Sequence, residues 1–93
     1  MAAQYSFLIT IREAEFYPGG MTVAYGLTSE PLQRVHFTGT LKGALAEMVR
    51  VSAFEPRSHA ASLTMRYSTD RKPAGFDKAA TTLRCNREEV PFV

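Results

Sequence analysis

Two runs of alternating apolar and polar residues, joined by a proline–glycine turn, constrain the fold of this chain most strongly. The apolar members are Tyr5, Phe7, Ile9 and Ile11 in the first run, and Met21, Val23, Tyr25 and Leu27 in the second. A period of two residues is typical of a strand with one buried face. Between the runs lies Tyr17-Pro18-Gly19-Gly20, in which proline fixes φ and glycine accepts positive φ. The pattern predicts an antiparallel β-hairpin.

A short strand and the clearest helix of the chain are predicted next. Val35 and Phe37 alternate with polar neighbours and indicate a short third strand. The apolar residues of the helix share one face at helical spacing: Leu41, Ala44, Leu45, Met48 and Val51. We expect Leu45 to be central on that face. Thr40 is the predicted N-cap, and Pro56 predicts that the helix ends near Phe54.

The C-terminal third contains a fourth predicted strand and a segment with two interpretations. Ala61, Leu63, Met65 and Tyr67 alternate with polar residues and predict the strand. A charged loop, residues 70–75, follows. Residues 76–85 fit either a short helix or a strand, because short apolar runs cannot be assigned from periodicity alone. We slightly prefer a helix from Phe76 to Leu83, followed by an extended tail.

The predicted order is β-β-β-α-β with an additional C-terminal helix or strand, which places the chain in the α+β class. At 93 residues, the expectation is a single domain, 1–93, with one helix packed on one face of a small antiparallel sheet. The residues expected to meet across that interface are Phe7, Ile9, Ile11, Val23, Tyr25, Leu63 and Met65 from the sheet, and Leu41, Leu45 and Met48 from the helix.

Composition indicates a soluble cytoplasmic protein without a membrane partner. Cys85 is the single cysteine, so an intramolecular disulfide is excluded. No apolar run approaches the roughly 18–20 residues of a membrane-spanning helix. The first residues lack the basic group that opens a signal peptide.

Motifs for catalysis, metal binding and cofactor binding are lacking, so we predict no catalytic residue, metal or cofactor. His36, His59 and Cys85 lie far apart in the sequence and lack metal-ligand spacing. A pairing of Cys85 with either histidine is formally conceivable but has no supporting motif. We therefore expect two solvated histidines and a half-buried thiol. The turn at residues 38–43 lacks the P-loop pattern and predicts a capped helix start.

A basic surface is the first candidate for partner binding. Residues 57–93 carry seven basic and four acidic groups, whereas residues 1–56 carry four basic and five acidic groups. Arg66, Arg71 and Lys72 lie within seven residues and are the predicted contacts for phosphates or an acidic protein surface. The wider basic cluster adds Lys78, Arg84 and Arg87. The alternative is a solvated surface offset by neighbouring carboxylates.

Aromatic residues at the ends of elements form the second candidate. Phe16 and Tyr17 lie at the predicted hairpin tip, where they cannot easily reach the core, and Phe54 and Phe92 lie at other element ends. Exposed aromatic side chains often anchor protein interfaces. The alternative is that these rings close over the edge of the core.

Three functions follow from these observations. In size and general make-up, without a shared motif, the chain resembles the small proteins that phages and mobile elements encode to inhibit host machinery, including anti-CRISPR proteins. That resemblance implies a non-catalytic inhibitor that occludes a protein partner, such as a nucleic-acid-processing complex. The alternatives are a small nucleic-acid-binding domain and an accessory subunit of an enzyme complex. The formal net charge of +2 favours the inhibitor over the nucleic-acid binder. A homodimer formed through strand edges also stays open.

Overall fold

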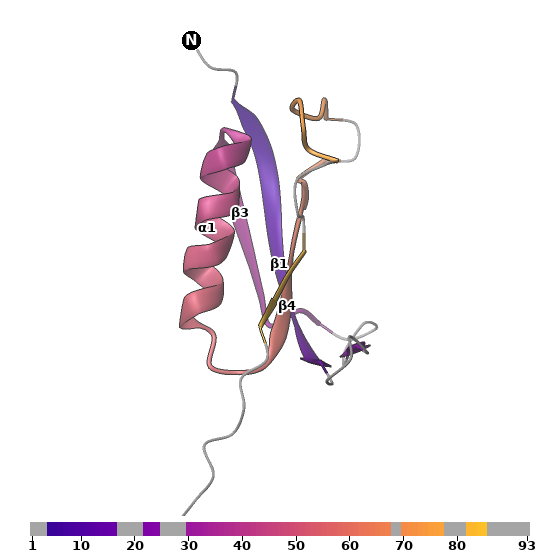
Figure 1. The fold of residues 1–93 in the computed structure, drawn as a ribbon. Helices are drawn as coiled ribbons and strands as arrows, with labels where there is room; N and C mark the ends of the chain where they lie inside the picture. The colour runs from indigo at the N-terminus through magenta and orange to yellow at the C-terminus, as the bar shows by residue number, and fades with distance from the viewer. Residues whose placement is uncertain (1–3, 17–21, 25–29, 68–69, 78–81, 86–93) are drawn as a thin grey trace, which may run out of the picture.

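The computed structural model describes residues 4–16, 22–24, 30–67, 70–77 and 82–85, which form one helix on one side of a sheet (Figure 1). The elements are β1 (Tyr5–Phe16), β2 (Thr22–Ala24), β3 (Gln33–Gly39), α1 (Leu41–Phe54), β4 (His59–Met65) and β5 (Thr82–Cys85). All strand pairings are antiparallel. The predicted α+β class is confirmed.

Strand β1 is the centre of the sheet. Its residues Phe7–Ile11 pair with β3 on one side and with β4 on the other, and β4 pairs in turn with β5. Because β3 and β4 both run antiparallel to β1, they run parallel to each other, and α1 is the crossover that joins them. The far end of β1 pairs with β2, with Glu15 opposite Val23, which confirms the hairpin. Its turn, residues 17–21, lies outside the described residues.

Helix α1 begins and ends where the sequence predicts. The Thr40 hydroxyl accepts a hydrogen bond from the Gly43 N–H at 3.1 Å and so caps the first turn. The helix ends at Phe54, two residues before Pro56. Among the described residues, no helix has the length and hydrophobicity needed to cross a membrane.

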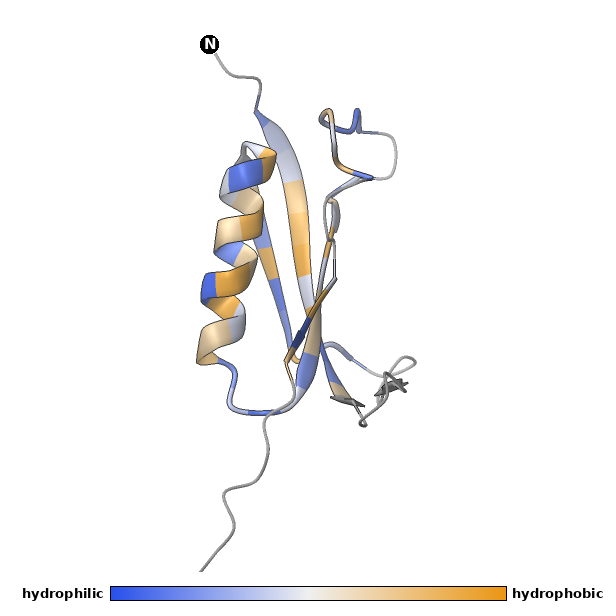
Figure 2. Ribbon diagram, viewed as in Figure 1, coloured by the Kyte–Doolittle hydropathy of each residue, from blue (hydrophilic) through white to orange (hydrophobic). Residues whose placement is uncertain are grey.

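The core lies between α1 and the helix-facing side of the sheet. Phe7, Ile9, Ile11 and Leu63 are at most 2% exposed, and Ala44, Met48 and Val51 of α1 pack against them. The most hydrophobic stretch of β1 therefore lies level with the helix (Figure 2).

Two expectations about this core differ from the structure: the central position of Leu45, and the full burial of Leu41 and Met65. Leu45 is not central, because the helix contacts the sheet through Ala44, Met48 and Val51, and Leu45 lies at the margin of that stripe, partly buried. Leu41 and Met65 are also partly buried. Of the other predicted core residues, Tyr25 and the side chain of Val23 lie outside the described part.

Residues 74–77 form a turn and Thr82–Cys85 form a strand, so the strand interpretation of the C-terminal segment is confirmed and the preferred helix from Phe76 to Leu83 is wrong at both of its ends; residues 78–81 lie outside the described part. Residues 74–77 make a turn in which Gly75 has a φ of 82° and the Phe76 N–H donates to the Pro73 carbonyl at 3.2 Å. That turn places Phe76 in the core, where its ring stacks on Phe7 with the centroids 6.3 Å apart. Strand β5 then pairs with β4, a non-local contact that local periodicity does not encode.

Candidate binding surfaces

The face of the sheet opposite α1 is the largest candidate surface, and we call it the outer face. Since side chains alternate along a strand, the residues beside Phe7, Ile9 and Ile11 point away from the helix. Its described members are Ser6, Leu8, Thr10 and Arg12 of β1, Arg34, His36 and Thr38 of β3, Ala60, Ser62 and Thr64 of β4, Arg66 just after β4, and Thr82 and Arg84 of β5. None of these residues is acidic.

Strand register brings three arginines together on the outer face. Arg12 pairs with Ala60, which pairs with Arg84, so two arginines flank one small residue. With strands about 4.8 Å apart, their Cα atoms lie about 10 Å apart. Arg34 pairs with Thr10 and is therefore a diagonal neighbour of Arg12, at about 7–8 Å. Arg34 and Arg84 are exposed, and Arg12 is partly buried.

The sequence-predicted basic residues gather at the end of the sheet where β4 finishes. Arg66, Arg71 and Lys72 are all exposed, and we call them the basic end. The Arg66 N–H donates to the Ser6 carbonyl at 3.0 Å, which attaches this residue to the outer face. Lys72 bonds to the Asp77 carboxylate at 3.4 Å, so part of the positive charge at the basic end is offset. Of the wider cluster, Arg84 lies on β5, and Lys78 and Arg87 lie outside the described residues.

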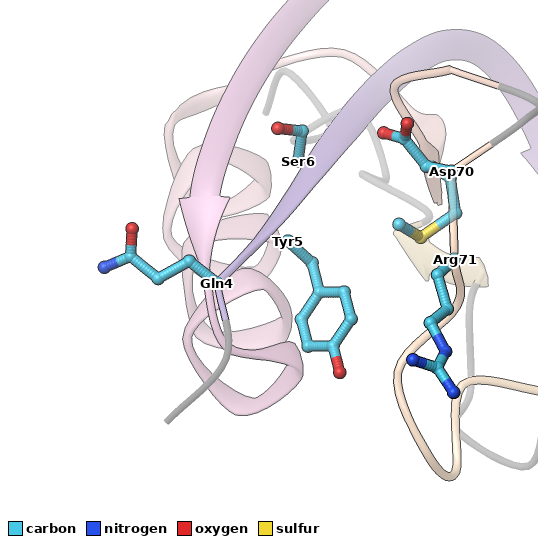
Figure 3. A pocket seen from close by; sticks show the side chains of 6 residues that line it. Gln4, Tyr5, Ser6, Asp70 and Arg71 are labelled. Carbon is cyan, nitrogen blue, oxygen red and sulfur yellow. The ribbon is translucent and has the colours of Figure 1, made fainter. Parts of the chain in front are cut away.

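Two hollows flank Met65 at the basic end. One, of about 630 Å³, is lined by Arg66 and Lys72 together with Thr64, Met65 and Phe76. The other, of about 430 Å³, is lined by Gln4, Tyr5, Ser6, Met65, Asp70 and Arg71. In the second hollow the Tyr5 hydroxyl and the Arg71 guanidinium project in the same direction, while the Asp70 carboxylate points elsewhere (Figure 3). The structure thus brings the three predicted basic residues to one end of the sheet, around two separate hollows.

His59 is buried, so the expectation of two solvated histidines is wrong for this residue. Its ring is 0% exposed, whereas His36 is exposed as expected. Nδ1 lies 2.6 Å from the Arg57 carbonyl oxygen, and Nε2 lies 2.6 Å from Oγ of Ser52, which is itself 4% exposed. Because a carbonyl only accepts, Nδ1 carries the hydrogen, and in the neutral ring Nε2 accepts from the Ser52 hydroxyl.

This hydrogen-bonded pair resembles a nucleophile and its base, but its surroundings favour a structural role. A catalytic serine and histidine must reach a substrate, and both side chains are closed off in the core. Cys85 is directly opposite His59 in the β4–β5 register and is partly buried, as predicted. Both nitrogens of His59 are already engaged by Ser52 and Arg57. Within the described ranges, no group of three or more His, Cys, Asp or Glu side chains is arranged to hold a metal ion.

An ion pair joins the end of α1 to the start of β4. The Glu55 carboxylate, 8% exposed, accepts a hydrogen bond from Arg57 Nε at 2.7 Å and another from the Arg57 backbone N–H at 3.2 Å. Burial acts to raise the pKa of Glu55, but the hydrogen bonds and charge of Arg57, with a smaller contribution from His59, outweigh it and lower that pKa. Glu55 is therefore ionised in the folded protein at neutral pH.

The aromatic candidates are only partly placed by the structure. Phe16 ends β1 beside Thr22, but its side chain and all of Tyr17 lie outside the described part, as does Phe92. Phe54 is 77% exposed at the end of α1, so it does not close over the core. Tyr67 is 53% exposed and lies under the Arg66 guanidinium, 5.1 Å from its ring centroid.

The outer face was missed as a binding surface because it depends on pairing between distant segments. Arg12, Arg34 and Arg84 are spread over most of the chain, and net charge says nothing about which face they share. A usable signal was present in each strand: all three occupy positions that alternate with apolar residues. Assigning each charged residue to a face of its predicted strand would have separated the two sides of the sheet.

Comparison with known proteins finds no matching family model, no similar curated protein and no similar solved structure.

Proposed function

We propose that this protein is a non-catalytic binding protein that covers an anionic macromolecular surface with the outer face of its sheet. The observation that carries the proposal is the register that gathers Arg12, Arg34 and Arg84 on a face whose described residues include no carboxylate. Clustered positive charge attracts an anionic partner and speeds its association. The basic end extends the same surface through Arg66. A cytoplasmic setting belongs to the proposal and rests on the single cysteine.

The buried histidine supports a non-catalytic role. His59 has both ring nitrogens hydrogen-bonded and lies beneath the surface, so it cannot exchange a proton with a substrate there. His36, on the outer face, lies opposite Leu8 in the strand register, a side chain that cannot act as a nucleophile. The outer face offers donors for binding anions.

Heparin, a generic polyanion, tests this function with matched variants. R34Q/R84Q and K42Q/R50Q each remove two formal positive charges at exposed residues, the first pair from the outer face and the second from α1, where Arg50 forms an ion pair with Glu47. We expect wild type and K42Q/R50Q to elute from immobilised heparin at similar salt concentrations, because Lys42 and Arg50 lie on the opposite side of the molecule. R34Q/R84Q should elute at distinctly lower salt.

A third variant and a stability control complete the experiment. R71Q/K72Q should also elute at lower salt than wild type, because Arg71 and Lys72 extend the basic surface, although Asp77 offsets part of the Lys72 charge. All variants carry exposed substitutions and should keep thermal midpoints close to that of wild type. Equal elution of the outer-face and helix variants, or failure of the wild type to bind, would overturn the proposal.

A further inference from the structure

The centre of the outer face is a row of hydroxyl groups with arginines at one end and along one side. Thr10 pairs with Ser62, and Ser62 pairs with Thr82, so three hydroxyl-bearing residues lie side by side across β1, β4 and β5. Arg34 pairs with Thr10 and so ends the row on β3, whereas Arg12 and Arg84 lie two residues further along β1 and β5, both on the same side of the row. Arginine and hydroxyl side chains are prominent among the groups that contact the phosphates and sugars of nucleic acids.

The shape of the outer face restricts which nucleic acid can meet this row. Four strands spaced about 4.8 Å apart make a platform about 14 Å wide, and α1 backs it on the other side. The major groove of B-form DNA, about 12 Å wide, admits a helix or a two-stranded ribbon, and the minor groove is only about 6 Å wide. The minor groove of A-form RNA is wide and shallow and displays the 2′-hydroxyls.

From this match we infer that the outer face binds double-stranded RNA across its minor groove. The row of Thr10, Ser62 and Thr82 contacts 2′-hydroxyls, because both kinds of hydroxyl can donate and accept hydrogen bonds. Arg34 at the β3 end of the row, and Arg12 and Arg84 beside it, contact phosphates of the duplex. Recognition of this kind is independent of base sequence. The inference rests on the proposed function and narrows its anionic partner to one class.

Two other partners fit the outer face less well. Protein interfaces are anchored by aromatic and large apolar side chains, and on the described part of this face Leu8 is the one large apolar residue and is partly buried. Single-stranded nucleic acids bind by stacking bases on aromatic rings. No aromatic residue is among the described members of the outer face, so unpaired bases have no stacking platform there.

Fluorescence anisotropy with a labelled RNA duplex of about 20 base pairs tests the inference directly. We expect wild type to bind duplexes of unrelated sequence equally well and to bind the matching DNA duplex roughly tenfold more weakly. In R34Q/R84Q, two phosphate contacts are lost, so the slope of log affinity against log salt should become shallower by nearly two. K42Q/R50Q is the charge-matched control and should leave that slope unchanged.

A hydroxyl variant separates recognition of RNA from simple attraction to phosphate. T10V/S62A removes two hydroxyls of the row without changing charge, and should weaken RNA binding severalfold while leaving DNA binding and the salt slope unchanged. Its circular dichroism melting curve shows whether the fold is retained.

The outcomes distinguish this inference from the proposed function. Equal affinity for RNA and DNA duplexes would overturn the RNA assignment while leaving the function intact, provided that R34Q/R84Q still shifts heparin elution. Tighter binding of polyglutamate than of the RNA duplex would identify an acidic protein, and not RNA, as the binding partner. No binding to RNA, DNA, polyglutamate or heparin would overturn both.

Discussion

The two faces of β1 are built from alternating residues of the same strand, and one forms the core while the other forms the proposed binding surface. Phe7, Ile9 and Ile11 face α1 and are 0% exposed, whereas Thr10 and Arg12, interleaved with them, lie on the outer face. The helix-facing side is apolar at its centre, with the buried His59 near one end, and the outer face is polar and basic. Stability and the proposed binding can therefore be changed separately in this protein, by substituting odd or even positions of one strand.

Replacing Ile9 by alanine gives the largest expected contrast with the outer face. The side chain is fully buried among core residues, so I9A should lower the free energy of unfolding by about 2–5 kcal/mol through lost burial and a residual cavity. The matched substitution T10A, one residue along, should cost less than about 1 kcal/mol. Urea denaturation followed by circular dichroism measures both. Similar losses in the two variants would mean that the sides of β1 are not distinct.

Replacing Ser52 by alanine should have an intermediate effect on the free energy of unfolding, and it tests the buried hydrogen bond on the helix side of the sheet. The substitution leaves Nε2 of His59 without the Ser52 hydroxyl in a fully buried position, at a cost of about 1–3 kcal/mol. S62A, which removes a hydroxyl from the outer face, is the control and should change stability by less than about 0.5 kcal/mol. If S52A unfolds at the same urea concentration as S62A, the buried hydrogen bond does not stabilise the fold.

The smallest expected effect is the pH dependence of stability that arises from the Glu55 carboxylate, next to the end of α1. The folded-state pKa of Glu55 is lowered, mainly by Arg57 acting against burial, so the unfolded state binds its proton first. This stabilisation is complete above the ordinary glutamate pKa of 4.5 and is lost as the pH falls through the lower folded pKa. E55Q should remove that part of the acid sensitivity, measured by urea denaturation between neutral and acidic pH. R34Q/R84Q should keep it, and an unchanged acid response in E55Q would contradict the assignment.

Much of the fold could be predicted because its elements carry strong local signals. The period of two in β1, the Thr40 cap and the Pro56 stop are properties of a few adjacent residues, and all of them are confirmed. The predictions were wrong where contact with a segment distant in sequence determines the local structure. Strand β5 forms because β4 offers an edge to pair with, and Leu45 lies at the margin because the rotation of α1 is set by the whole sheet.

The candidate sites were harder to predict, for the same reason. Arg66, Arg71 and Lys72 are close in sequence, and the structure does place them at one end of the sheet. Arg12, Arg34 and Arg84 become neighbours only through strand register. His59 is buried although imidazole is polar, because Ser52, two residues before the end of α1, supplies a hydrogen-bond partner.

The central position of β1 has a consequence for how the protein folds. Phe7 precedes Phe37 and Met65, its partners on either side, by long stretches of chain, so both loops must close before the middle of the sheet exists. Topologies dominated by such non-local pairing fold on a timescale of about milliseconds to seconds, because the entropy of closure is lost before contacts compensate for it. Until β4 docks, neither the apolar core nor the arginine platform is assembled. A nascent or partly unfolded chain therefore lacks the proposed binding surface. Binding becomes possible only in the folding step that completes the sheet.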